Sequence, residues 1–146
     1  MEKIMNKNLL VIPDCHAAPE YDNERFTALG NYIVDKQPGI IVCLGDFGDM
    51  PSLSSYDKGT KGFEGRRYSK DVDSVLDAQV KLFAPIKKLN ESKRKRKEKQ
   101  YKPKLHMCLG NHEDRIDRAV NSAPELDGAI SMKDLQYEKN GWKITP

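Results

Sequence analysis

The 146-residue sequence contains only three cysteines, and no two of them form a C-x-x-C pair. An odd number of cysteines beside aliphatic residues argues against a disulfide framework, so we interpret Cys15, Cys43 and Cys108 as small buried hydrophobic residues. No apolar run approaches the roughly 18 to 20 residues that a membrane span requires. The N-terminus also lacks the apolar core of a signal peptide, so we expect a cytoplasmic protein without membrane contact.

Excess positive charge is confined to one short stretch. The formal net charge is +3, but residues 91–104 alone hold eight Lys and Arg against two Glu. The rest of the chain carries 17 basic and 20 acidic side chains. This distribution excludes a uniformly basic nucleic-acid coat protein. It predicts one basic loop, or an extension of the preceding helix, over residues 91–104.

Three aliphatic runs, at residues 9–12, 40–44 and 105–109, are continuous rather than alternating, which is typical of strands buried on both faces. Helical spacing of apolar residues between the first two runs predicts a helix that Asp22 or Asn23 caps. A longer apolar stripe over residues 72–89 predicts a second helix, with a kink or break at Pro85. Strands joined by helical crossovers predict one α/β domain with a parallel sheet over residues 1–146.

Two further segments lie between or after these elements. Residues 50–69 contain three glycines and tandem serines, so we expect a long loop, which in a compact domain is usually functional or mobile. Asn140 and Gly141 predict a turn that leads into a final strand with no partner strand after it.

Each aliphatic run is followed by side chains of the types that bind metals. The three segments are Asp14-x-His16, Gly45-Asp46-x-x-Asp49 and Gly110-Asn111-His112-Glu113. Each pattern alone is weak, because Asp, Asn and Gly are common in turns. The carboxyl ends of parallel strands meet at one edge of a sheet, so the three together predict a single site.

The residue types in these segments suit a pair of divalent cations. Asp14 and His16 can converge on one ion, Asp46 can bridge it to a second, and Asn111 offers that second ion a neutral amide oxygen. Two such ions clamp a phosphoryl group and lower the pKa of a bridging water. His112 then remains free to protonate the leaving oxygen.

These three motifs, in this order, resemble those of the calcineurin-like metallophosphoesterase superfamily, and residues 49–59 and 63–68 are similar to phage-encoded members. The resemblance implies the first half of a β-sandwich flanked by helices. It also implies that Asp14, His16 and Asp46 bind one metal, that Asp46 and Asn111 bind the other, and that His112 is the acid. Glu113 and Arg115 match residues that support this histidine and the phosphate. Mn²⁺ is the favoured metal, with Fe, Zn²⁺ and Ni²⁺ as alternatives.

The sequence departs from this family after residue 112. The family continues with a separate histidine and a G-H-x-H motif, but the three histidines here are His16, His106 and His112. We therefore expect residues 1–146 to be the N-terminal part of the domain. A separate C-terminal chain, an artificial truncation or an interrupted gene would each explain the absence of the later histidine motifs. We expect this short chain alone to have little activity.

Several other residues have two interpretations each. Arg66 and Arg67 either hold substrate phosphates or belong to a solvated loop, and Tyr68 either stacks on a base or anchors that loop. Asp49 either bonds a metal-bound water or caps the loop. His106 is interpreted as structural.

Two functions of different classes follow. The first is a metal-dependent phosphoesterase that hydrolyses a phosphodiester or phosphomonoester, which includes nucleotides and nucleic acid. The second is an incomplete fragment that binds nucleic acid or protein through residues 91–104.

Overall fold

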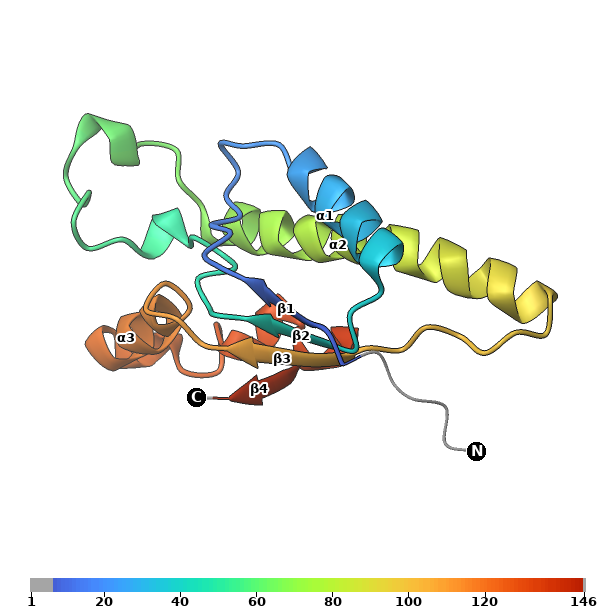
Figure 1. Ribbon diagram of the computed structural model, residues 1–146. Helices are drawn as coiled ribbons and strands as arrows, with labels where there is room; N and C mark the ends of the chain where they lie inside the picture. Colours follow the sequence, from blue (N-terminus) through green and yellow to red (C-terminus); the bar gives the residue numbers. More distant parts are fainter. Residues whose placement is uncertain (1–6, 146) are drawn as a thin grey trace.

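The protein, described here by a computed structural model covering residues 7–145, contains a four-stranded parallel sheet (Figure 1). Its strands are β1 (Leu9–Ile12), β2 (Ile40–Cys43), β3 (Lys104–Cys108) and β4 (Lys143–Thr145), and they lie side by side in chain order. Every neighbouring pair is parallel, with Ile12 beside Cys43 and Cys43 beside Met107. The structure therefore confirms the α/β fold with a parallel sheet.

Helices α1 (Glu24–Lys36) and α2 (Tyr68–Lys95) both cover the same face of this sheet (Figure 1). The N-cap position of α1 is Asn23, whose side chain makes no capping hydrogen bond, while the Asp22 carboxylate accepts the backbone N–H of Glu24 at 3.0 Å. The side chain of Asn23 instead donates to the carbonyl of Ser74 and the carboxylate of Asp77, both on α2. Asp22 therefore contacts the start of α1, whereas the side chain of Asn23 links α1 to α2.

Of the kink or break expected at Pro85, the break is wrong, because Pro85 lies inside the single 28-residue helix α2. Proline removes one hydrogen bond of the helix. Leu82, Phe83 and Ile86 on either side are buried in the core, so packing against the sheet and α1 holds the helix together. Gly30 of α1 lies against this turn, since an added Cβ would be 2.9 Å from the Pro85 ring.

The segment between β2 and α2 is a long connection with two single helical turns, at Pro51–Leu53 and Lys61–Phe63. It ends at residue 67, two residues earlier than predicted, because Tyr68 and Ser69 already belong to α2. Residues 91–95 extend α2, and residues 96–103 form the connection to β3. The basic stretch is therefore partly helix and partly loop.

After β3 the chain forms α3 (Asp114–Ser122) and three short helical turns before it enters β4. Gly141 has a φ of 96° and makes the turn into β4, as the sequence predicts. The strand pairs with β3, which precedes it in the chain. Tyr137 and Trp142 are both buried. The ring centroid of Tyr137 is 5.9 Å from that of Phe47, and the ring centroid of Trp142 is 5.8 Å from that of Phe83.

The other face of the sheet exposes apolar side chains. Leu9, Val11 and Leu44 are all about half exposed or more. Parallel sheets are usually covered on both faces, so this surface is unusual for its architecture. Of the cysteines, Cys43 is buried, whereas Cys15 and Cys108 are only partly so. Across residues 7–145, no helix has the length and apolar character needed to cross a membrane.

Candidate metal centre

The loops that follow β1, β2 and β3 meet at one end of the sheet, beside α3 (Figure 1). The first two loops are joined by backbone hydrogen bonds, from His16 to the Asp46 carbonyl at 2.9 Å and from Ala17 to the Phe47 carbonyl at 2.8 Å. The backbone N–H of His112 donates to the Asp46 carboxylate at 2.8 Å, which ties in the third loop. All three motifs therefore share one edge of the sheet.

Three side chains from these loops can place ligand atoms around one point. Those of His16, Asp46 and His112 each offer one such atom, and the three atoms lie within 4.8 Å of one another. Asp46 is only 9% exposed, so its carboxylate faces the protein and not bulk solvent. The two imidazole rings pack edge to face, with centroids 4.5 Å apart. We call these three residues the His-Asp-His cluster.

The backbone at this cluster is unusual. His16 and Asp46 have φ values of 51° and 50°, in the left-handed region that residues other than glycine seldom adopt. Such strain persists where the surroundings enforce it, and it is common at functional sites. Gly110 leaves the room that Asp46 needs, because an added Cβ would lie 2.6 Å from the carboxyl carbon of Asp46. Gly45 in turn faces Gly110, where a Cβ would lie 2.6 Å from the backbone nitrogen.

Glu113 holds the loops after β2 and β3 together. Its fully buried carboxylate accepts backbone N–H groups from Asp46 at 2.9 Å, Phe47 at 2.8 Å and Gly110 at 3.2 Å. The hydroxyl of Tyr137 donates to the same carboxylate at 3.1 Å. Burial and the neighbouring Glu113 raise the pKa of Tyr137 well above its usual value, so its proton remains available for this bond. No sequence signal pointed to Tyr137.

Asp49 lies behind both histidines. Its carboxylate oxygen Oδ1 is 2.9 Å from Nδ1 of His16 and 2.9 Å from Nδ1 of His112. The backbone carbonyl of Asp49 is also 2.8 Å from Nδ1 of His112. A carboxylate accepts hydrogen bonds, so this arrangement favours the tautomer with the proton on Nδ1 of each ring, in which Nε2 can bind a metal ion. Carboxylates orient histidine ligands in this way in many metal sites.

The other residues of the three motifs lie around the cluster. Asp14 is exposed, and it is outside the group whose ligand atoms converge. Asn111 is also exposed and lines a pocket between α3 and residues 52–58. Arg115 of α3 donates to the Asp49 carbonyl at 3.0 Å and lines the same pocket.

The arginines of the long connection contact that connection itself. Arg66 donates to the Asp57 carboxylate at 2.9 Å and to the Pro51 carbonyl at 3.1 Å. This pairing lowers the pKa of the Asp57 carboxyl and raises that of Arg66. Arg67 donates to the Arg66 carbonyl, and the Tyr68 hydroxyl donates to Asp134 at 2.6 Å. All of these contacts are with the protein itself. Substrate binding by Arg66, Arg67 and Tyr68 therefore stays a prediction.

Comparison with known proteins gives two similar sequences. The chain is 29% identical over 133 residues to the Gene 54 protein of Mycobacterium phage L5, which covers 90% of this chain and 46% of that protein. It is 28% identical over 123 residues to the Gene 54 protein of Mycobacterium phage D29, covering 84% of this chain and 42% of that protein. No family model and no solved structure matches the chain. The chain thus spans less than half the length of these curated relatives, and both relatives are phage proteins.

Proposed function

We propose that this chain carries part of the active site of a metal-dependent phosphoesterase of the calcineurin-like superfamily. One observation carries the proposal. His16, Asp46 and His112, from the loops after three adjacent parallel strands, offer ligand atoms that lie within 4.8 Å of one another.

The donor set fits a divalent cation. Imidazole nitrogens and a carboxylate oxygen suit Mn²⁺, Fe, Zn²⁺ and Ni²⁺. The Asp49 carboxylate supports this use, because it occupies Nδ1 of both rings and leaves each Nε2 free. Asp14 and Asn111 lie on the same loops, and we propose that they add oxygen ligands. Divalent ions bound there would lower the pKa of a water and offset the negative charge of a phosphoryl group.

The residues of this chain have distinct tasks in the proposed hydrolysis. Water attacks phosphorus, the ester P–O bond breaks, and the leaving oxygen takes a proton. His112 is positioned to give that proton when its Nε2 is protonated and not bound to an ion, because Asp49 and its carbonyl fix the opposite edge of the ring. Protonation of the alcohol as it departs matters most when that alcohol is a poor leaving group. Glu113 keeps Asp46 in its strained conformation and so acts as a positioning residue.

The residues named so far do not supply a complete shell for two ions. We propose that further ligands come from polypeptide outside these 146 residues, either a continuation or a separate chain. The greater length of the two phage relatives supports this proposal, since each has more than half its length beyond the matched region. A cytoplasmic location remains a prediction from the sequence.

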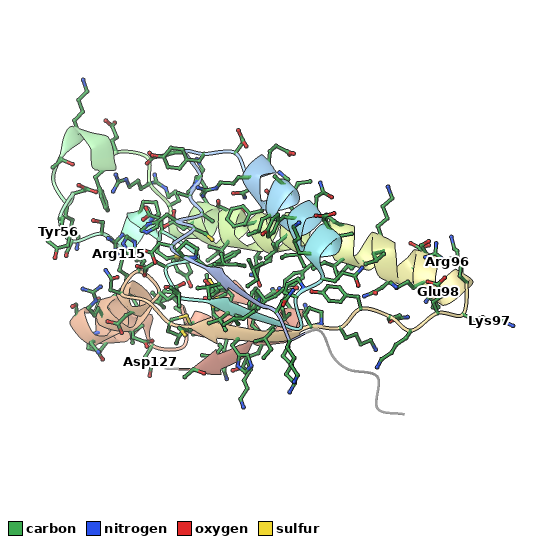
Figure 2. The ribbon with its side chains drawn as sticks, viewed as in Figure 1. Tyr56, Arg96, Lys97, Glu98, Arg115 and Asp127 are labelled. Atoms are coloured by element: carbon green, nitrogen blue, oxygen red, sulfur yellow. The ribbon has the colours of Figure 1, made fainter. Side chains whose placement is uncertain are left out.

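A second candidate function is the binding of nucleic acid or protein through the basic stretch at residues 91–104. Arg96 and Lys97 follow the C-terminal end of α2. They lie at the opposite end of the molecule from Arg115 of α3 (Figure 2). Any phosphate backbone bound there would contact a surface separate from the His-Asp-His cluster. Part of this charge is already paired, because Glu98 accepts from Arg96 at 2.9 Å.

Hydrolysis of bis-nitrophenyl phosphate tests the proposed function. We expect little turnover by the short chain alone. We expect Mn²⁺-stimulated turnover when the chain is joined to, or co-expressed with, the polypeptide that supplies the further ligands. Asp46→Asn should abolish most of it, whereas Asp73→Asn, an exposed acid on α2, should not. His112→Ala should slow alkyl esters more than nitrophenyl esters. Equal turnover by wild type and Asp46→Asn would refute the proposal.

A further inference from the structure

A pocket of about 730 Å³ opens beside the His-Asp-His cluster, between α3 and residues 52–58. Asn111, which precedes His112, and Arg115, which donates to the Asp49 carbonyl, both line it. Volumes of roughly 300 to 1,000 Å³ are usual for small-molecule sites. Figure 2 shows Tyr56 and Arg115 at this end of the molecule.

The charged side chains that line the pocket are mainly cationic. Lys58, Arg115 and Arg118 face it, against a single acid, Asp114. Arg118 donates to the Asn111 carbonyl at 2.8 Å, which fixes its guanidinium close to the cluster. Its Nε pairs with Asp114 at 3.2 Å on the exposed surface, where such a pair is weak. The pocket thus favours a ligand with at least one phosphate on the side of Asn111.

The remaining lining of the pocket mixes serines with apolar side chains and one aromatic ring. Leu53, Ala119 and Leu126 line it, and Tyr56 completes it from the long connection. Tyr56 is 86% exposed, the most exposed of the large hydrophobic side chains noted among residues 7–145. An exposed ring close to apolar side chains and a group of cations can stack on a planar base while the cations contact its phosphate.

We infer that this pocket binds a nucleotide, with its phosphate toward Asn111, Arg115 and Arg118 and its base against Tyr56 and Leu53. The inference deepens the proposed function and rests on it only for the claim that the phosphate beside Asn111 is the one attacked. It names a nucleoside phosphoester as the substrate class, and it assigns base recognition to Tyr56.

Calorimetry without metal tests the inference separately from hydrolysis. The full chain in EDTA is titrated with AMP, ribose 5-phosphate and inorganic phosphate. We expect AMP to bind at least about fivefold more tightly than ribose 5-phosphate, because stacking of one base on an aromatic ring contributes that much or more. Tyr56→Ala should remove this preference and leave ribose 5-phosphate affinity unchanged. Arg118→Gln should weaken both ligands by about fivefold or more.

Two matched controls lie away from the pocket. Tyr32→Ala removes a half-exposed tyrosine of α1, and Arg96→Gln removes an arginine at the far end of α2, so neither should change binding. Equal affinity for AMP and ribose 5-phosphate, no binding at all, or no effect of Tyr56→Ala would overturn the inference. Nucleotide binding that depends on Tyr56, in a protein that stays without phosphoesterase activity when the additional polypeptide is supplied, would refute only the proposed function.

Discussion

Glu113 accepts the backbone N–H of Asp46 at 2.9 Å, so a buried carboxylate after β3 fixes the conformation of the proposed ligand after β2. We predict that Glu113→Gln destabilises the protein by about 2 to 4 kcal/mol. The amide has only one acceptor oxygen, which leaves buried N–H groups of Asp46 or Phe47 without partners. Denaturant unfolding of both proteins measures the loss.

Glu125→Gln serves as the control for this change, because Glu125 is exposed in the turn after α3. We expect that variant to unfold within about 0.5 kcal/mol of wild type. A Glu113→Gln variant as stable as the Glu125→Gln control would show that Glu113 does not hold the two loops.

Gly110→Ala should disturb the cluster directly. The new methyl group would lie 2.6 Å from the carboxyl carbon and backbone nitrogen of Asp46, and neither Asp46 nor the strand ends can move without breaking other bonds. We expect a loss of at least about 2 kcal/mol in unfolding free energy. Gly62→Ala is the control, since a Cβ there meets nothing within 4 Å. Equal stability of the two variants would contradict this close approach.

Asp71 predicts a pH dependence with a definite sign. Its side chain is 1% exposed, and one carboxylate oxygen accepts the Ser52 N–H at 2.9 Å while the other has no partner. Burial raises the pKa of this carboxyl. A raised pKa gives stability that is present below the unfolded value, near pH 4, and is lost as the pH rises through the folded value.

We therefore expect the free energy of unfolding of Asp71→Asn to rise relative to that of wild type as the pH is raised from 4 to 7, because asparagine does not titrate. Unfolding free energies at the two pH values measure this change, and Asp73→Asn on the exposed side of α2 is the comparison. If the free energy of unfolding of Asp71→Asn minus that of wild type is constant with pH, or falls from pH 4 to pH 7, burial does not raise this pKa.

The open face of the sheet predicts self-association of the isolated chain. Val11 is 46% exposed on this face, beside Leu9 and Leu44. Contiguous apolar surfaces of this kind associate in water. Val11→Lys should shift the sedimentation coefficient toward the monomer value at high concentration. Val80→Lys, on α2 and 64% exposed in wild type, should leave it unchanged. A wild-type chain that stays monomeric at all concentrations would contradict this prediction.

The elements with strong local patterns could be predicted from the sequence. Continuous aliphatic runs predicted β1, β2 and β3, and the polar residues after each run predicted where the strand ends meet. The fate of Pro85 could not be predicted in this way, because the burial of its neighbours against α1 and the sheet outweighs the local cost of proline. Local propensity carries no information on such packing.

Relationships between distant residues were also beyond sequence reasoning. The contact of Asp49 with both His16 and His112 requires three loops in register, and the pocket requires α3 to lie beside residues 52–58. Tyr137 reaches Glu113 only because the turns after α3 return over the sheet. Asp14 and Asn111 were expected among the converging ligands, but both are exposed, and Asp14 is outside the cluster.

Mn²⁺ titration of the chain, followed by the electron paramagnetic resonance signal of free Mn²⁺, tests the central claim most directly. We predict weak but saturable binding that Asp46→Asn reduces at least about tenfold and that Asp73→Asn does not change. His16→Ala should lower it similarly, since His16 supplies another of the three converging ligand atoms. Binding that is unsaturable in wild type, or equal in wild type and Asp46→Asn, would contradict a metal centre that includes His16 and Asp46.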